Sequence, residues 1–92
     1  MKIDNKKHQI EDGSLGAEIG VLIGKTFQAS ADMITDETRR GDLEQWDSLG
    51  HLTLIEALRE RFGIEITPED ALDMDTVRDI KRIVFALYSA RQ

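Results

Sequence analysis

The feature that most constrains this chain is the helical spacing of its apolar residues, combined with a single proline in 92 residues. In the first segment, apolar residues recur at i, i+4, i+7, i+8 and i+12 and so share one face of a helix. They are Leu15, Ile19, Leu22, Ile23 and Phe27. Later segments repeat this spacing, and the sequence has no internal repeat or low-complexity stretch. We therefore expect an all-α domain.

Capping and stop signals divide the chain into three longer helices and one short helix. The first helix should begin near Ser14, and the second should run from about Ser48 to Phe62. Thr67 should begin a short third helix, and Thr76 should cap a fourth. The predicted fold is a four-helix bundle with a long loop, about residues 29–46, between helices 1 and 2.

The chain is long enough for one domain with one modest core. We expect residues 1–13 to form a polar N-terminal arm, residues 14–88 the folded domain, and residues 89–92 a C-terminal tail. The expected hydrophobic centre consists of Ile19, Leu22, Phe27, Leu52, Ile55, Leu58, Phe62, Ile80 and Val84.

Composition narrows the possible functions. The net charge is -6 and the pI is about 4.8, so the basic footprint of a nucleic-acid-binding protein is missing. No apolar run approaches the ~20 residues of a membrane span, and no apolar stretch follows the N-terminal lysines as in a secretory signal. We expect a cytoplasmic monomer that meets basic faces on other proteins.

Catalytic and metal sites are not expected. Ser48 and His51 lie three residues apart on one helix, but no third orienting group and no glycine-rich oxyanion loop accompany them. The carboxylates of Asp70, Asp73 and Asp75 lack the central glycine and distal glutamate of a calcium loop. The chain has no cysteine, which excludes thiolate ligands and a thiol of its own for acyl chemistry.

The second helix has an unusual polar face. On a helical wheel Leu49 falls with Thr53, Glu56 and Glu60, at i, i+4, i+7 and i+11, and away from the apolar arc. Single exposed leucines are common, so this position can be unremarkable. Alternatively, the leucine and the glutamates form a small docking face beside the Ser48 hydroxyl.

Four short motifs identify a family resemblance. They are DSL at 47–49, FGIEI at 62–66, TPED at 67–70 and TVRDI at 76–80. With their spacing and the long first loop, they resemble the acyl carrier protein family, the phosphopantetheine-bearing carriers of fatty-acid, polyketide and related pathways. The resemblance covers about residues 14–88 and implies the four-helix acyl-carrier bundle.

The resemblance implies that Ser48 is esterified by a 4′-phosphopantetheine arm, which coenzyme A donates. A helix N-terminus suits this linkage, because its free N–H groups and positive dipole end favour a phosphodiester. The arm ends in a thiol, which this chain lacks. Acyl groups would be carried on it as thioesters, and the protein would be a non-catalytic cosubstrate of pathway enzymes.

The same resemblance implies partners and a docking surface. Asp47, Leu49, Thr53, Glu56 and Glu60 correspond to positions that meet partner enzymes. The implied partners are a phosphopantetheinyl transferase, an acyl-loading ligase or acyltransferase, and synthases or transferases with basic docking patches. Asp47 has a second possible role as the helix N-cap.

The sequence also departs from the fatty-acid branch, which usually reads Asp-Leu-Gly-x-Asp-Ser-Leu. Here DLEQWDSL has one extra residue and no glycine, and the motif is followed by Gly50 and His51. These departures indicate a stand-alone carrier of a specialised pathway. Trp46 is expected to fold over the core edge, or else to shape the mouth of an acyl pocket. His51 is expected to be exposed to solvent, or else to approach the phosphate.

Two other functions remain open at this stage. One is a peptidyl or aminoacyl carrier, which would use the same arm on Ser48 for a different cargo. The other is a helical protein-interaction module that is never primed, in which Ser48 serves only at a helix start.

Overall fold

A computed structural model of the chain describes residues 12–90. Within this range the regular secondary structure is entirely helical, apart from one isolated bridge between Arg39 and Thr76. The elements are α1 (Asp12–Phe27), the 3₁₀ turn η2 (Ala31–Met33), α2 (Ser48–Phe62), α3 (Pro68–Leu72) and α4 (Val77–Ala90). The predicted arrangement of three longer helices, one short helix and a long first loop is confirmed.

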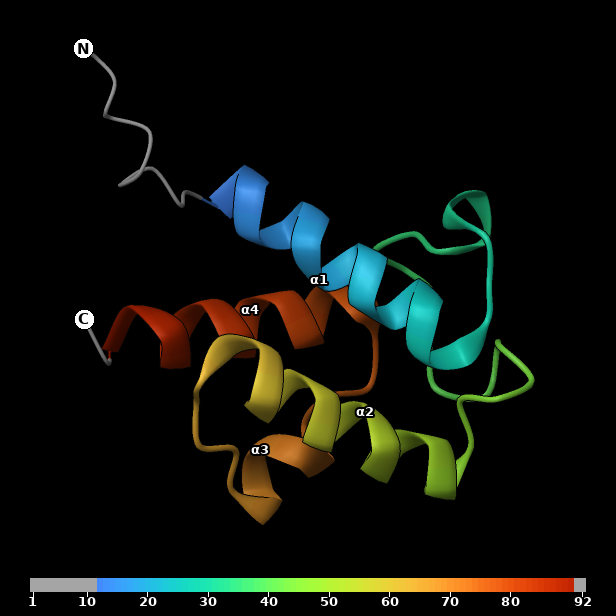
Figure 1. Cartoon of the computed structure of the whole chain (residues 1–92). Coiled ribbons are helices and arrows are strands. Elements are labelled where there is room, and N and C mark those ends of the chain that lie inside the picture. The colour runs from blue at the N-terminus through green and yellow to red at the C-terminus, as the bar shows by residue number, and fades with distance from the viewer. Residues whose placement is uncertain (1–11, 91–92) are drawn as a thin grey trace, which may run out of the picture.

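Three longer helices form the body of the molecule, and α3 lies against α2 (Figure 1). α1 runs in the opposite direction to both α2 and α4, and it packs against each of them. The start of α1 and the end of α4 lie at one end of the bundle, whereas the loop from α1 to α2 occupies the other end. The start of α2 therefore lies beside this loop.

Local capping explains where the shorter elements begin. Thr67 and Asp70 form a reciprocal capping box at α3, with Pro68 in the first turn. Thr76 and Asp79 exchange the same pair of hydrogen bonds at α4, with distances of 3.1 Å each. α2 ends at Gly63, whose φ of 63° is the left-handed conformation that glycine adopts most readily. The predicted caps at Thr67 and Thr76 are confirmed.

The core runs through all three longer helices and includes side chains from the loop and from the α3–α4 connection. Its fully buried members include Trp46 and Met74, which join α1, α2 and α4 residues in one cluster. Of the residues expected at the centre, six are buried and two are half-buried at its edge: Ile19, Phe27, Leu58, Phe62, Ile80 and Val84, then Leu22 and Ile55.

The assignment of Leu52 to the core is wrong, because its side chain is 63 % exposed. The buried stripe of α2 is narrower than the apolar arc suggested. It consists of His51, Leu54, Leu58 and Phe62, at i, i+3, i+7 and i+11. His51 occupies the inward position at the start of the helix, so the adjacent Leu52 is turned toward solvent.

The long loop is ordered by backbone hydrogen bonds to the α3–α4 connection. Thr38 O accepts from Val77 N at 2.9 Å, and Arg40 N donates to Asp75 O at 2.9 Å. Leu43 and Trp46 are buried from this loop, so its own side chains help to pack it. The loop consequently has a fixed path that leads directly into α2.

Helices α1 and α4 lie at the two ends of the described residues. α1 begins at Asp12, two residues before the expected start, and α4 continues to Ala90. The rest of the predicted arm, residues 1–11, and the last two residues of the predicted tail lie outside the described residues. None of the helices described between residues 12 and 90 is long and apolar enough to cross a membrane.

Candidate functional site

Ser48 is the first residue of α2, and its side chain is exposed. Asp47 caps the helix: its Oδ1 accepts from Gly50 N at 2.8 Å, and its carbonyl accepts from His51 N at 2.8 Å. The capping role predicted for Asp47 is therefore confirmed. No hydrogen bond to the Ser48 hydroxyl occurs among residues 12–90, so an external reagent can reach this oxygen.

The loop crosses Gly50 at very short range. A Cβ placed on Gly50 would lie 1.8 Å from Gln45 O and 3.1 Å from Phe27 Cε1. Only glycine leaves room for this crossing, so Gly50 allows the loop to enter α2 just ahead of Ser48. The sequence interpretation noted Gly50 as a departure from the family pattern and missed this role, although a glycine inside a helix was a signal.

Trp46 is fully buried between two rings. Its indole stacks on Phe27 of α1 at a centroid distance of 5.6 Å and on His51 of α2 at 6.3 Å. Trp46 therefore joins the end of α1 to the start of α2 from within the loop. This agrees with the expected packing of Trp46 on the core, and its burial is deeper than an edge position.

The expectation that His51 is exposed is wrong, because its side chain is only 6 % exposed. Its Nδ1 lies 3.0 Å from Trp46 Nε1, and its Nε2 lies 2.8 Å from Ala71 O at the end of α3. A histidine can replace an apolar residue in a core when both ring nitrogens have partners. Both nitrogens of His51 are used inside the protein, away from the Ser48 hydroxyl.

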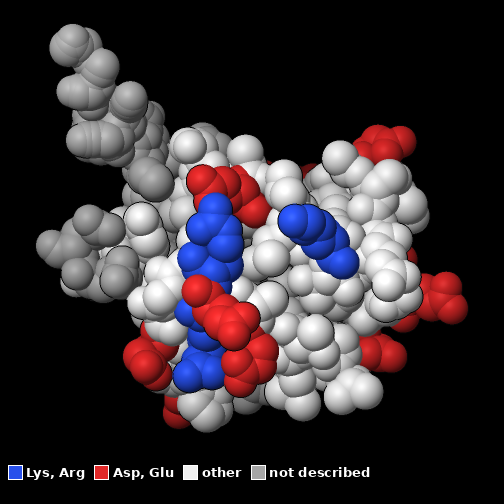
Figure 2. Space-filling model, viewed as in Figure 1, with Lys and Arg blue, Asp and Glu red and all other residues white. Residues whose placement is uncertain are grey.

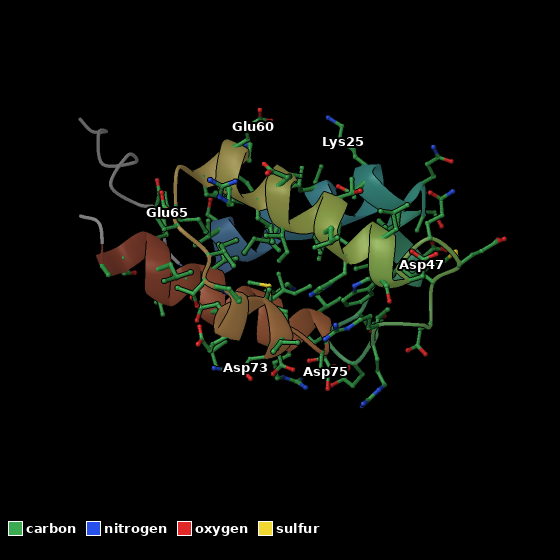
Figure 3. All side chains as sticks on the ribbon, turned by 90° about the horizontal axis from the view of Figure 1, so that it is seen from below. Lys25, Asp47, Glu60, Glu65, Asp73 and Asp75 are labelled. Atoms are coloured by element: carbon green, nitrogen blue, oxygen red, sulfur yellow. The ribbon has the colours of Figure 1, made fainter. Side chains whose placement is uncertain are left out.

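The predicted polar face of α2 is present. Leu49, Thr53, Glu56 and Glu60 are all exposed, and Leu49 is 73 % exposed. Asp47 lies at the start of α2 and Glu60 near its end, so the face extends along the helix (Figure 3). The structure thus brings the predicted docking residues to one surface, next to Ser48.

This surface is not uniformly acidic. Glu56 pairs with Arg59 at 3.1 Å, and Arg61 pairs with Glu18 of α1. Acidic and basic side chains accordingly alternate on the half of this face nearer the end of α2, whereas the half nearer the loop is mostly uncharged (Figure 2). The exposed leucines of α2, Leu49 and Leu52, lie in its first half.

A shallow depression borders the start of α2. It lies between the end of α1, the loop and the first turns of α2, and its lining includes Phe27, Gln45, Asp47, Leu49 and Thr53. The depression therefore offers apolar and polar surface that includes Asp47 and Leu49, the two neighbours of Ser48 in the sequence. Trp46 and His51 do not line it, because they are buried beneath the loop.

Comparison with known families gives a match over most of the chain. The family described as "Phosphopantetheine attachment site" matches residues 17–84. This range includes all of α2 and α3 and the loop that precedes them.

Comparison with solved structures supports the fold. The chain is similar to the solution NMR structure of a holo acyl carrier protein from Geobacter metallireducens, with a TM-score of 0.74 and 22 % sequence identity. The similarity covers 83 % of this chain and 87 % of that protein. The predicted acyl-carrier-like bundle is confirmed.

Proposed function

Because the chain belongs to the phosphopantetheine-attachment family of carrier proteins, we propose that it carries acyl groups as thioesters on an arm attached to Ser48. Its cofactor is covalently attached 4′-phosphopantetheine. The proposed setting is a fatty-acid, polyketide or specialised acyl-transfer pathway of the cytoplasm. The carrier unit would be residues 14–88, acting as a monomer and as a cosubstrate of pathway enzymes.

The observation that carries the proposal is the exposed Ser48 hydroxyl at the first position of a capped helix. Asp47 holds the cap, so the Ser48 oxygen is left available for a bond to phosphorus. Serine at this position has no packing role, because its side chain is exposed. The surrounding residues fix the helix start and leave the hydroxyl in solvent.

The first turn of α2 also suits the phosphate of the arm. Asp47 satisfies the N–H of Gly50, whereas the N–H groups of Ser48 and Leu49 have no acceptor among residues 12–90. These two N–H groups and the helix dipole would favour the phosphodiester by roughly 0.3–1 kcal/mol at an exposed site. When bound, the arm supplies the thiol that this cysteine-free chain lacks.

Partner enzymes would dock along the exposed face of α2. Leu49 would supply the apolar contact, while Asp47, Thr53, Glu56 and Glu60 would supply polar contacts to basic patches. Glu56 already pairs with Arg59, so Glu60 would be the more available carboxylate for a partner. The proposed partners are a phosphopantetheinyl transferase, an acyl-loading ligase or acyltransferase, and synthases or transferases of the pathway.

Intact mass measurement tests the attachment site. The purified chain is incubated with coenzyme A and a broad-specificity phosphopantetheinyl transferase, with Ser48→Ala and Ser89→Ala as matched variants. We expect the wild type to gain one phosphopantetheine and Ser48→Ala to gain none. Ser89→Ala should behave as the wild type. Modification of Ser48→Ala would move the site, and no modification with several transferases would favour an unprimed interaction module.

Charging assays test the cargo. The primed chain is offered fatty-acyl, malonyl and aminoacyl donors with their loading enzymes, and the products are weighed. We expect acyl loading. Exclusive loading with amino acids would replace the proposal with a peptidyl or aminoacyl carrier.

A further inference from the structure

A buried polar chain links three elements around the start of α2. Trp46 in the loop contacts His51 of α2 at 3.0 Å, and His51 contacts Ala71 O of α3 at 2.8 Å. Trp46 is fully buried, and His51 is nearly so. His51 lies one helical turn after Ser48, so these hydrogen bonds lie at the start of α2, close to the proposed attachment site.

The donors and acceptors fix the protonation state of His51. An indole N–H can only donate, so His51 Nδ1 must accept from Trp46 and carries no proton. A carbonyl oxygen can only accept, so His51 Nε2 must carry the proton and donate to Ala71. His51 is therefore neutral, and a second proton on Nδ1 would confront the Trp46 N–H with another donor.

Burial, one hydrogen bond and two charged side chains set the pKa of His51. Burial lowers the pKa of His51, and the hydrogen bond to Ala71 opposes that effect. Arg40 of the loop lowers the pKa further, whereas Asp75 of the α3–α4 connection raises it. The net direction is downward, so the neutral form persists below the ordinary histidine value of about 6.5.

Few other contacts hold α3 in its position. It has five residues, none of which is buried, and only Met74 beyond its end reaches the core. Besides His51, the side chain of Arg40 donates to Leu72 O at 3.4 Å and to Met74 O at 3.0 Å. Loss of the His51 bond would therefore remove the tie from α2 to the end of α3.

We propose that neutral His51 is a positioning residue, a latch that holds the loop and α3 against the first turn of α2, and that protonation of its Nδ1 releases the loop from this latch while Nε2 still donates to Ala71 O. Above the pH range in which Nδ1 of His51 is protonated, Trp46 stays between Phe27 and His51, and the start of α2 is fixed in place. Below it, the Trp46 bond is lost and the start of α2 loosens. The effect on Ser48 rests on the proposed function, whereas the latch itself does not.

Histidine NMR tests the latch on the unmodified chain. At pH ~8, nitrogen shifts should show His51 protonated at Nε2 only, and its titration midpoint should lie below ~6.5. Loss of the Trp46 donor in Trp46→Phe should raise the midpoint by about one pH unit, the scale of one hydrogen bond. A midpoint at or above the ordinary value, or one unchanged in Trp46→Phe, would overturn the proposal.

Tryptophan emission reports the release, because Trp46 is the sole tryptophan of the chain. On acidification, the emission of the wild type should shift to the red with the His51 midpoint, while the helical circular dichroism is retained. The other histidine gives the matched control: His8→Gln should keep this transition, and His51→Gln should lack it. The same transition in His51→Gln would contradict the latch.

Priming rates connect the latch to Ser48. The ratio of the wild-type rate to the His51→Gln rate cancels the pH dependence of the transferase itself. This ratio should fall as the pH drops through the His51 midpoint. A constant ratio would overturn the effect on Ser48, whereas the absence of priming at every pH would refute the attachment proposal and leave the NMR result to decide the latch.

Discussion

Gly50 determines how closely the loop can approach α2. A methyl group there would overlap Gln45 O, which belongs to the backbone and cannot turn away as a side chain can. We expect Gly50→Ala to destabilise the fold by about 1–3 kcal/mol, measured by urea unfolding. Gly20→Ala is the matched control, because no atom lies within 4 Å of its added Cβ.

The Gly20→Ala variant should behave in the opposite way. Gly20 lies inside α1, where alanine is favoured over glycine by roughly 1 kcal/mol, so the variant should be more stable than the wild type. Equal effects of the two substitutions would show that helix propensity, and not the loop crossing at Gly50, dominates.

The two roles of Asp47 can be separated at the level of the residue. Asp47→Ala removes the acceptor for Gly50 N and should cost about 1 kcal/mol, whereas Asp47→Asn keeps a capping oxygen and should cost little. Urea unfolding measures both. If Asp47 also contacts the priming enzyme through its charge, Asp47→Asn should slow priming at unchanged stability.

At the scale of the elements, local signals predicted the helix starts well. Thr67, Thr76 and Asp47 each accept from an N–H group three residues away, so the sequence alone contains the whole interaction. The short α3 and the polar face from Leu49 to Glu60 followed from the same local spacing.

The buried side of α2 was harder to predict because it depends on distant partners. His51 is buried only because Trp46 and Ala71 satisfy its nitrogens, and Ala71 lies 20 residues away. Hydropathy favoured Leu52 for the core, and no local pattern showed that His51 would replace it. Gly50 inside a predicted helix was a signal, but the backbone that crosses it could not be identified, because this depends on the path of the loop.

Arg40 should govern the local stability of α3 and its connection to α4. Its guanidinium contacts Met74 O and Asp75 Oδ1 at 3.0 Å each. In Arg40→Met we expect amide hydrogens of residues 71–76 to exchange about tenfold faster or more. Unchanged exchange there, or an equal increase in the middle of α1, would contradict this local role.

At the scale of the whole molecule, ion pairs at the surface join the loop between α1 and α2 to α4. Asp36 of the loop accepts from Lys81 of α4 at 2.8 Å, and Arg78 pairs with Glu37 at 2.8 Å. Asp73 and Asp75 lie on the side of the molecule away from Glu60 (Figure 3). The charged side chains therefore lie on different surfaces of the molecule. The ion pairs near Asp36 hold the loop to α4.

Two carboxyls should govern stability in acid. The hydrogen bond from Lys81 lowers the pKa of Asp36 below its usual value. Partial burial raises the pKa of Asp79, but hydrogen bonds from Arg82 and Thr76 outweigh it and lower the pKa. The folded state then binds fewer protons than the unfolded state, so this stability is present above pH ~3.9 and is lost as the pH falls through the folded pKa values.

Urea unfolding between pH ~5 and pH ~2.5 measures this loss, and a His51→Gln background removes any contribution of His51 to it. Asp36→Asn removes one of the two lowered carboxyls, so its stability should fall less steeply with acid than that of the wild type. Asp32→Asn is the matched control, since Asp32 is exposed in the same loop and has no ion pair within residues 12–90. If both variants lost stability along the same curve, the Asp36–Lys81 bond would not be what holds the loop to α4 in acid.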